Sequence, residues 1–432
     1  MALRSRLSGL LDKTGQQAQE SGDFVLSIAL SAKETVIMSV SHGREFLSIP
    51  GPTTVPDAVL QAMHRPAVDI YGGELVGITD SCLADIGRIM GTAGSTYIYI
   101  ANGHGAWEAA LTNVLSRGDK VLVLESGRFA VGWGGMAEIM GIEVETLPGD
   151  WRRAVDPAAL QARLQADRSG AIKAILVVQV DTASGVVNDL PAIRQAIDAA
   201  GHGALLLVDT IASLATMPYA MDAWGIDVTV AASQKGLMMS PGLGFVGVGE
   251  KARRAYESAG LRTRYWDWGF RDGPVHYMKY CGTPPVHLLF GLRRALDLIF
   301  EEGIDQVLKR HRLLASAVRA AIGVWSEAGG LAFNVVEPHQ RADSVTPIQV
   351  AAGHDPRAIL DYCKNNCGVT LGVGLGELDG KGFRIAHMGH VNAPMILGTL
   401  GAVEMALCAL GIPHGKGGMQ AAIESLARAV PA

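Results

Sequence analysis

The sequence predicts an α/β fold built on a mainly parallel β-sheet, followed by a smaller α+β unit. From about Ser95 to Gly249, short apolar segments alternate with stretches of helical spacing. The apolar segments are continuous, which is typical of parallel strands that are buried on both faces of a sheet. From about Gly303 the order changes to a helix, two strands, a second helix and a last strand, which indicates a separate unit.

The individual elements follow this alternation in chain order. The expected strands of the first region are Tyr97–Ile100, Val121–Leu124, Ile172–Val178, Ala204–Asp209 and Val228–Ala232, and its helices are Ala106–Leu115, Phe129–Met140 and Leu190–Ala200. A long helix from Val286 to Glu302 is expected to lead into the second unit. The elements expected there are strands around Phe333–Val336, Thr346–Val350 and Phe383–His387 and a helix near Pro356–Asn365.

The chain is long enough for more than one domain. Of its 432 residues, 49% are hydrophobic and 18% are charged, so it can bury a large core. We expect an N-terminal extension over residues 1–45, a large domain over 46–305 and a small C-terminal domain over 306–432. The N-terminal segment of the large domain is expected to contact the small domain.

Charge, cysteine content and hydropathy exclude several classes of protein. The net charge is -5 and no Lys/Arg cluster is present, so we expect no nucleic-acid partner. The apolar stretch Val391–Pro413 is interrupted by Asn392, Pro394 and Glu404, which favours a buried core helix over a membrane span. Five scattered cysteines indicate reduced thiols and no metal site. A soluble cytoplasmic protein with small-molecule partners is expected.

Two charged residues stand at the ends of predicted strands. Asp209 closes the strand Ala204–Asp209, and Lys235 follows the strand Val228–Ala232. A site for pyridoxal phosphate can be built in this way, because the lysine amine forms a Schiff base and the aspartate keeps the pyridine nitrogen protonated. A solvated surface lysine is the alternative. The first interpretation requires a phosphate cradle and a carboxylate clamp elsewhere in the chain.

A glycine-rich turn at Ala101–Glu108 is the candidate phosphate cradle. It follows a strand and opens a helix, so its backbone N–H groups and the helix N-terminus favour an anion. The same turn also forms for packing reasons alone. A second glycine-rich segment, Gly372–Gly376, resembles a dinucleotide loop but lacks the third glycine at the proper spacing and stands outside a βαβ unit. A nicotinamide dehydrogenase, the alternative that this loop would support, is therefore disfavoured.

Three further residues lie where a cofactor or substrate would need them. Phe129 follows a strand and could stack on a flat ring, or it is an ordinary core residue of its helix. Thr182, in the segment Asp181–Gly185, offers a hydroxyl or is part of a turn. Arg384 lies in the apolar strand Phe383–His387, where an unpaired guanidinium is costly, so it binds either a substrate carboxylate or a structural partner.

Together these segments resemble the class V aminotransferases of the fold-type I pyridoxal-phosphate enzymes, in particular the serine or alanine:glyoxylate aminotransferase group. The similarity runs from Ile49 to about Gly411. Its most specific segments are Ser233–Gly236, Pro241–Gly244, Gly105–Asn113, Val208–Asp209, Thr283–Pro285 and Arg384–Ile385. The resemblance implies pyridoxal 5'-phosphate as cofactor and a mainly parallel seven-stranded sheet in the large domain.

The resemblance also implies a role for each site residue. The residues implied to bind the cofactor are Asn102, Gly103 and His104 at the phosphate, Phe129 on the ring, Thr182 at the ring hydroxyl, Asp209 at the pyridinium, Gln234 in support of the phosphate, and Lys235 as Schiff base and proton shuttle. Arg384 would hold the substrate carboxylate. Tyr280 and Thr283 would reach the phosphate of the neighbouring subunit, which implies a homodimer with shared active sites.

The implied reaction is transfer of an amino group from a small L-amino acid (serine, alanine or aspartate) to a 2-oxo acid, glyoxylate or pyruvate. One departure affects the substrate side: the chain has Asp69–Glu74 where relatives carry Asp-His-Arg. The alternatives are a lyase or desulfurase of the same fold and a non-catalytic cofactor-binding module. Desulfurases usually have a histidine where this chain has Gln234, and a module without turnover would lack one of Lys235, Asp209 and Arg384.

Overall fold

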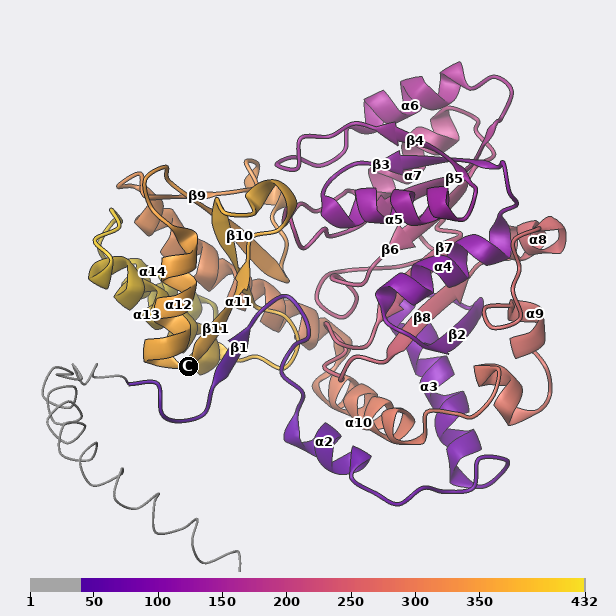
Figure 1. Cartoon of the computed structure of the whole chain (residues 1–432), viewed down its shortest axis with the longest axis horizontal. Coiled ribbons are helices and arrows are strands. Elements are labelled where there is room, and N and C mark those ends of the chain that lie inside the picture. Colours follow the sequence, from indigo (N-terminus) through magenta and orange to yellow (C-terminus); the bar gives the residue numbers. More distant parts are fainter. Residues whose placement is uncertain (1–39, 431–432) are drawn as a thin grey trace, which may run out of the picture. The chain divides into compact units, whose positions relative to one another are not determined.

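The computed structural model describes residues 40–430, so most of the extension predicted over 1–45 lies outside the described residues. Its larger sheet has seven strands in the order β2-β8-β7-β6-β5-β3-β4 (Figure 1). These strands are β2 (Ser95–Ile100), β3 (Lys120–Leu124), β4 (Glu143–Leu147), β5 (Ile172–Val178), β6 (Leu205–Asp209), β7 (Val228–Ala232) and β8 (Leu243–Val248). The strand β8 is antiparallel to both of its neighbours, β2 and β7, and all other neighbouring strands of this sheet are parallel. The predicted seven-stranded, mainly parallel sheet is confirmed.

Helices cover both faces of this sheet and explain why its strands are continuously apolar. The helices along this part of the chain are α4 (Gly103–Val114), α5 (Arg128–Ile139), α6 (Pro157–Ala166), α7 (Leu190–Ala199) and α8 (Glu250–Ser258). On β3, Val121 and Val123 pack in a core cluster with α4 and α5, whereas Leu122 and Leu124 pack in the opposite cluster with α6 and α7. Successive residues of a strand point to opposite faces, so both sets are buried.

The sequence analysis did not predict β4 and β8. The β4 segment contains two glutamates, Glu143 and Glu145, because it is the edge strand and only β3 pairs with it. The β8 segment contains Gly244 and Gly247, where added Cβ atoms would lie 3.1 Å from the Asn102 carbonyl oxygen and 2.8 Å from the Met90 sulfur. Close packing therefore requires glycine in a strand, which conceals the strand pattern.

A third group of helices and the N-terminal part of the described chain pack beside the larger sheet. They are α2 (Asp57–Met63), α3 (Glu74–Met90), α9 (Trp268–Arg271), the 3-10 helix η1 (His276–Tyr280) and α10 (Val286–Glu302). Leucine and isoleucine side chains of α10 form an apolar core with α3 and β8. The predicted bounds of α10 are confirmed.

The smaller sheet has five strands in the order β1-β11-β12-β10-β9. Its strands are β1 (Phe46–Ser48), β9 (Leu331–Phe333), β10 (Val345–Val350), β11 (Val369–Val373) and β12 (Gly382–Ala386), and its helices are α11 (Ile304–Ser326), α12 (Pro356–Cys367), α13 (Ala393–Ala409) and α14 (Gly418–Ala429). Short 3-10 turns η2 (Pro338–Gln340) and η3 (Gly376–Leu378) complete it. The strand β1 comes from the N-terminal side and pairs in parallel with β11.

One predicted strand was wrong in position. The segment Phe333–Val336 was expected to be a strand, but β9 ends at Phe333. The Asn334 side chain instead donates hydrogen bonds to the carbonyl oxygens of Trp151 and Ser184, which takes this segment out of the sheet. Most of the apolar segment at Val391–Pro413 forms helix α13, which is partly buried rather than a fully buried core helix, since Met405 is 46% exposed. No helix within residues 40–430 is long and apolar enough to cross a membrane. The domain bounds at 45 and 305 stay a prediction.

Candidate active site

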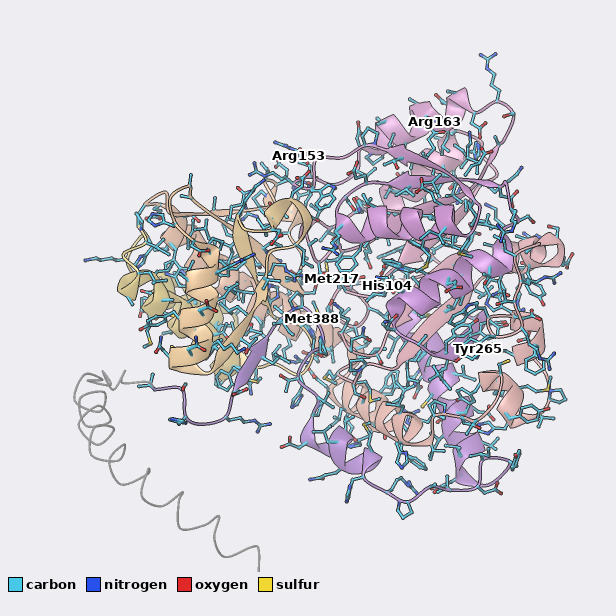
Figure 2. The ribbon with its side chains drawn as sticks, in the orientation of Figure 1. His104, Arg153, Arg163, Met217, Tyr265 and Met388 are labelled. Atoms are coloured by element: carbon cyan, nitrogen blue, oxygen red, sulfur yellow. The ribbon has the colours of Figure 1, made fainter. Side chains whose placement is uncertain are left out.

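A cavity of about 220 Å³ lies at the carboxyl ends of β6 and β7. Figure 2 labels His104 beside it, at the first turn of α4. The predicted site residues that line the cavity are Asn102, Gly103, His104, Phe129, Thr182, Asp209, Gln234 and Lys235. The structure therefore brings these residues together, although they come from separate strand ends and turns along the chain.

The Lys235 side chain is half-buried and lies against the segment that precedes α2. Its amine donates a hydrogen bond to the Pro50 carbonyl oxygen. Burial, followed by the nearby positive charge of Arg384, lowers the pKa of Lys235 to about 8. Gly51 has a φ of +106°, and an added Cβ there would lie 2.6 Å from the lysine nitrogen. Glycine is required because the backbone passes directly over this amine.

Asp209 ends β6 with its carboxylate facing the same cavity, and it is 2% exposed. One oxygen accepts a hydrogen bond from the Ile211 amide at 2.6 Å, and the other accepts one from the Trp107 indole N–H at 2.7 Å. Burial raises the pKa of Asp209 to about 7 in spite of these bonds. A lysine and a buried carboxyl, both of perturbed pKa, in one cavity are typical of a functional site.

The predicted phosphate cradle has one feature that the sequence did not reveal. The Asn102 side chain caps α4, since its oxygen accepts hydrogen bonds from the backbone amides of His104 and Gly105 at 3.1 and 3.3 Å. An anion at this helix terminus would therefore compete with Asn102 for those amides. At Gly103, an added Cβ would lie 2.3 Å from an Ile211 methyl carbon, so close packing with the loop after β6 requires glycine.

Two other polar groups of the cavity wall have room for a ligand. The side-chain oxygen of Gln234 is buried and has no hydrogen-bond partner within residues 40–430. Thr182, which follows β5, also lines the cavity. A buried polar atom without a partner is costly, so a ligand group that donates a hydrogen bond to the Gln234 oxygen would be stabilised.

Three aromatic rings form one wall of the cavity. The ring centroid of Trp107 lies 4.6 Å from that of His104 and 6.4 Å from that of Phe129. Burial, with a smaller effect of Arg128 and Lys235, lowers the pKa of His104 below its usual value. The His104 ring is therefore mainly neutral at neutral pH and presents a flat face beside Phe129.

Arg384 reaches this region from β12 of the smaller sheet and is 6% exposed. Its Nε donates to the Val373 carbonyl oxygen at 2.7 Å, and Nη1 donates to the Thr182 carbonyl oxygen at 3.0 Å. Within the described residues Arg384 makes no ion pair. Burial lowers its pKa to about 10, so it stays charged at neutral pH. The structural ion pair that the sequence left open as an alternative role for Arg384 is therefore absent within residues 40–430.

An apolar cluster fixes the elements around Arg384 against the cavity wall. It contains Val180 and Ala212, which follow β5 and β6. These two residues pack with Val345, the first residue of β10, and with Met388, which follows β12. Met217 packs on this cluster, and both methionines are labelled in Figure 2. The guanidinium is therefore held in place by backbone oxygens and by packing.

Tyr280 and Thr283 do not line the cavity of their own chain. The Tyr280 side chain is 1% exposed, and its hydroxyl is hydrogen bonded to Thr79 at 2.9 Å. Thr283 is exposed. The divergent segment Asp69–Glu74 lies beside η1, since the Ile70 carbonyl oxygen is 2.7 Å from the His276 ring. The roles predicted for these residues at a neighbouring subunit stay predictions.

The segment Gly372–Gly376 is not a strand-to-helix turn of a parallel unit. Gly372 lies in β11, which is antiparallel to β12, and an added Cβ would lie 3.2 Å from the Arg384 Cβ. Its glycines thus allow close packing beside the arginine. Trp107 lines the cavity and is a residue that the sequence reasoning missed. Trp107 follows His104 by one helical turn, and that spacing could have placed both on the same face of α4.

Comparisons with known proteins agree with this geometry. The family described as aminotransferase class-V matches residues 46–377. A serine–glyoxylate aminotransferase of Methylorubrum extorquens is 38% identical over 90% of this chain and 97% of the relative, and an L-aspartate–glyoxylate aminotransferase of Paracoccus denitrificans is 36% identical over 84% and 91%. The crystal structure of pyridoxamine-pyruvate aminotransferase from Mesorhizobium loti superposes with a TM-score of 0.81 and 27% identity, covering 91% of this chain and all of the other.

Proposed function

This chain belongs to the class-V aminotransferase family, and we propose that it transfers the amino group of a small L-amino acid to glyoxylate or pyruvate with pyridoxal 5'-phosphate in the 220 Å³ cavity. One observation carries this proposal: Lys235 and Asp209 line the same cavity, and Arg384 donates a hydrogen bond to the carbonyl oxygen of Thr182, a residue of the cavity wall. The names of the relatives from Methylorubrum extorquens and Paracoccus denitrificans support serine and aspartate as donors and glyoxylate as acceptor.

The residues of the cavity fit this cofactor. Its wall offers one amine, Lys235, for a covalent bond to an aldehyde, and one buried carboxylate, Asp209, for a ring nitrogen. The unpartnered side-chain oxygen of Gln234 and the hydroxyl of Thr182 are available for polar groups at the edge of the ring. The aromatic face of Phe129 suits a flat ring.

When bound, pyridoxal phosphate supplies an electron sink and a carbon that carries the amino group between the two half-reactions. Lys235 would hold the cofactor until the substrate amine displaces it, and its nitrogen would then move a proton from the substrate Cα. Its pKa of about 8 suits this work, because a large share of the amine is neutral near that pH. Asp209 would keep the ring nitrogen protonated by its negative charge.

Arg384 would hold the substrate carboxylate by a particular edge of its guanidinium. Because Nε and one N–H of Nη1 already bind the backbone oxygens of Val373 and Thr182, the remaining donors are the other N–H of Nη1 and both of Nη2. A carboxylate would therefore be bound end-on by Nη1 and Nη2 together. The same backbone contacts fix the direction from which the substrate enters.

We further propose that the protein is a cytoplasmic homodimer in which Thr283 reaches the phosphate in the neighbouring subunit. Thr283 is exposed, so its hydroxyl is accessible to a second chain. Tyr280 would contribute through its position next to Thr283, since its own hydroxyl is bound to Thr79. A Thr283→Val variant is therefore expected to lose more cofactor than Tyr280→Phe.

The proposed function is tested by absorbance and by a substrate screen. Purified protein loaded with pyridoxal phosphate is expected to be yellow and to lose this colour when an amino donor is added. Serine, alanine, aspartate and pyridoxamine, the last because the Mesorhizobium relative is named for it, are then paired with glyoxylate, pyruvate, oxaloacetate and 2-oxoglutarate. Bleaching without formation of any new amino acid, or no cofactor binding at all, would contradict the proposal.

A further inference from the structure

The hydrogen bonds of Asp209 come from two donors of different kinds. The Ile211 amide is a backbone group, which any residue but proline would supply at that position. The indole N–H of Trp107 is a side-chain donor from α4 and lies 2.7 Å from the second oxygen. Within residues 40–430 it is the one side chain that hydrogen bonds to this carboxylate. The identity of residue 107 therefore decides what faces Asp209.

The Trp107 ring is held so that it cannot turn away from Asp209. It is 1% exposed and stacks on Trp133, with ring centroids 5.8 Å apart and planes 15° from parallel. Phe129 and His104 contact its other sides. Packing against these three rings restricts its rotamer, so the indole N–H is directed at the carboxylate before any ligand arrives.

An indole N–H can only donate, and this restricts the form of its partner. A charged carboxylate oxygen accepts this hydrogen bond more strongly than an oxygen of the neutral acid does. Trp107 thus opposes the effect of burial, which favours the protonated acid at Asp209.

We propose that Trp107 is a positioning residue whose indole N–H keeps Asp209 ionised and fixes the orientation in which its carboxylate meets the cofactor ring. This inference rests on the proposed function, because it assigns the ring nitrogen of pyridoxal phosphate to Asp209. Trp107 acts through Asp209 and also lines the cavity wall with His104 and Phe129.

The chain offers a matched pair of variants for the test. Trp107→Phe keeps an aromatic ring against Trp133 and removes the indole N–H. Trp133→Phe is the control, because Trp133 Nε1 is buried without a hydrogen-bond partner in the described part of the chain, so that its loss breaks no bond. Both variants remove the same number of atoms from the same stacked pair, which matches their effects on packing.

The first measurement needs no cofactor. Infrared difference spectra of apoprotein against Asp209→Asn report the protonation of Asp209 as a function of pH. Trp107→Phe is expected to raise the pKa of Asp209 by roughly one to two pH units, and Trp133→Phe to leave it unchanged. Equal effects of the two variants would overturn the inference. If the protein binds no pyridoxal phosphate, the proposed function fails while this coupling is still measured.

The second measurement uses the loaded protein in a double-mutant cycle. Trp107→Phe is expected to weaken pyridoxal-phosphate binding about tenfold when Asp209 is present, and to weaken it no further in Asp209→Asn, where the indole faces an amide. Additive losses would show that Trp107 acts by packing alone. If Trp107→Phe does not fold, one indole N–H resonance of the wild type should titrate with Asp209 and become independent of pH in Asp209→Asn. The same titration in both proteins would overturn the inference.

Discussion

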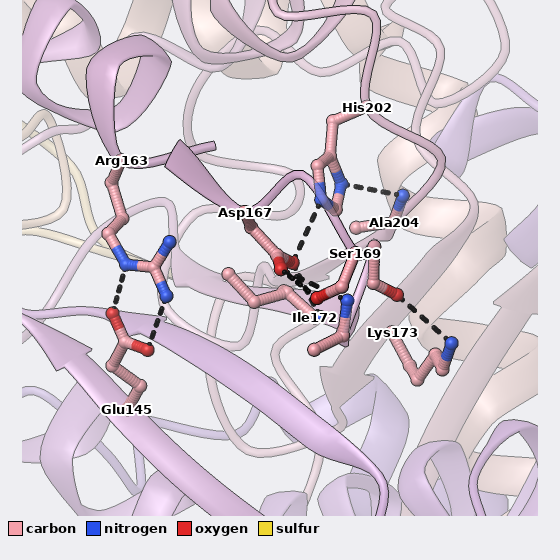
Figure 3. A network of polar contacts seen from close by, with 10 residues as sticks. Glu145, Arg163, Asp167, Ser169, Ile172, Lys173, His202 and Ala204 are labelled. Atoms are coloured by element: carbon pink, nitrogen blue, oxygen red, sulfur yellow. Dashed lines mark hydrogen bonds and ion pairs between the residues drawn. The ribbon is translucent and has the colours of Figure 1, made fainter. Parts of the chain in front are cut away.

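Two carboxylates at opposite ends of neighbouring strands have opposite environments. Asp167 lies near the start of β5, where it accepts hydrogen bonds from the Ile172 and Ala171 amides, the Ser169 hydroxyl and the His202 ring (Figure 3). The bond from the Ile172 amide contributes most to holding the pKa of Asp167 well below its usual range. Asp209, at the end of β6, accepts two such bonds, and burial raises its pKa to about 7.

The difference separates a structural carboxylate from one that is available to a ligand. A carboxylate has about four positions for hydrogen-bond donors. Protein donors supply four at Asp167, whereas at Asp209 they leave room on the side of the cavity. A buried carboxylate with too few hydrogen-bond donors destabilises the protein when no ligand is bound. The unfilled positions at Asp209 therefore indicate that another group binds to its carboxylate.

The largest expected effect concerns the amine beside Asp209. Lys235→Ala is expected to lower turnover by at least about four orders of magnitude, because Lys235 is the one amine among the residues that line the cavity. Circular dichroism should show an unchanged fold. Steady-state rates with the best donor and acceptor check this prediction, and turnover near the wild-type rate would remove Lys235 from the mechanism.

Asp209→Asn is expected to lower kcat by about two orders of magnitude or more while some cofactor is retained, since a neutral amide cannot keep the ring nitrogen protonated. The matched control is Asp167→Asn, which removes the same charge at the other end of the sheet and should leave kcat within about twofold of the wild type. Kinetics of both variants test whether the two carboxylates differ in function. Equal losses would erase the distinction between them.

Arg384→Lys should raise the KM values of the amino donor and of the oxo acid together, by about ten- to hundredfold, because an ammonium cannot reproduce two parallel hydrogen bonds. The loss of the contacts to Val373 and Thr182 would add to this effect. Initial-rate measurements with each substrate varied in turn provide the check. Unchanged KM values would assign Arg384 to the packing of the smaller sheet alone.

The pH dependence of apoprotein stability should show a smaller effect of Asp209. Its raised pKa means that the folded state holds a proton that the unfolded chain releases near pH 4. The free energy of unfolding should therefore fall between about pH 4 and 7, by on the order of 4 kcal/mol. Denaturant unfolding at several pH values should show this slope in the wild type, and its persistence in Asp209→Asn would assign it to another group.

Asp167→Asn is expected to lower the free energy of unfolding by about 1–3 kcal/mol at neutral pH through the loss of accepted hydrogen bonds. The pKa of Asp167 is lowered in the fold, so its contribution is present above about pH 4 and is lost as the pH falls further. The difference between variant and wild type should accordingly shrink in acid. A constant difference down to low pH would mean that the charge of Asp167 is not involved.

Much of the fold could be predicted because its signals are local. The apolar runs of β5 and β7 specify buried strands by themselves, and Asp209 and Lys235 at strand ends placed two groups of the site correctly at the same edge of the sheet. Where a strand depends on its neighbours, the signal failed. The polar edge strand β4 and the glycine-containing β8 were missed, and β9 was misplaced because Asn334 bonds to residues far along the chain.

The sequence by itself thus determined the alternation of strands and helices, the aminotransferase family and eight of the residues that line the cavity, because these depend on patterns within a few residues. Only the tertiary structure decided how those residues are charged and connected. The Trp107 bond to Asp209 joins residues 102 positions apart, and the Arg384 bond to Thr182 joins residues 202 apart. Burial and the supply of hydrogen-bond donors set the protonation of a side chain, and both come from segments that meet only when the chain has folded.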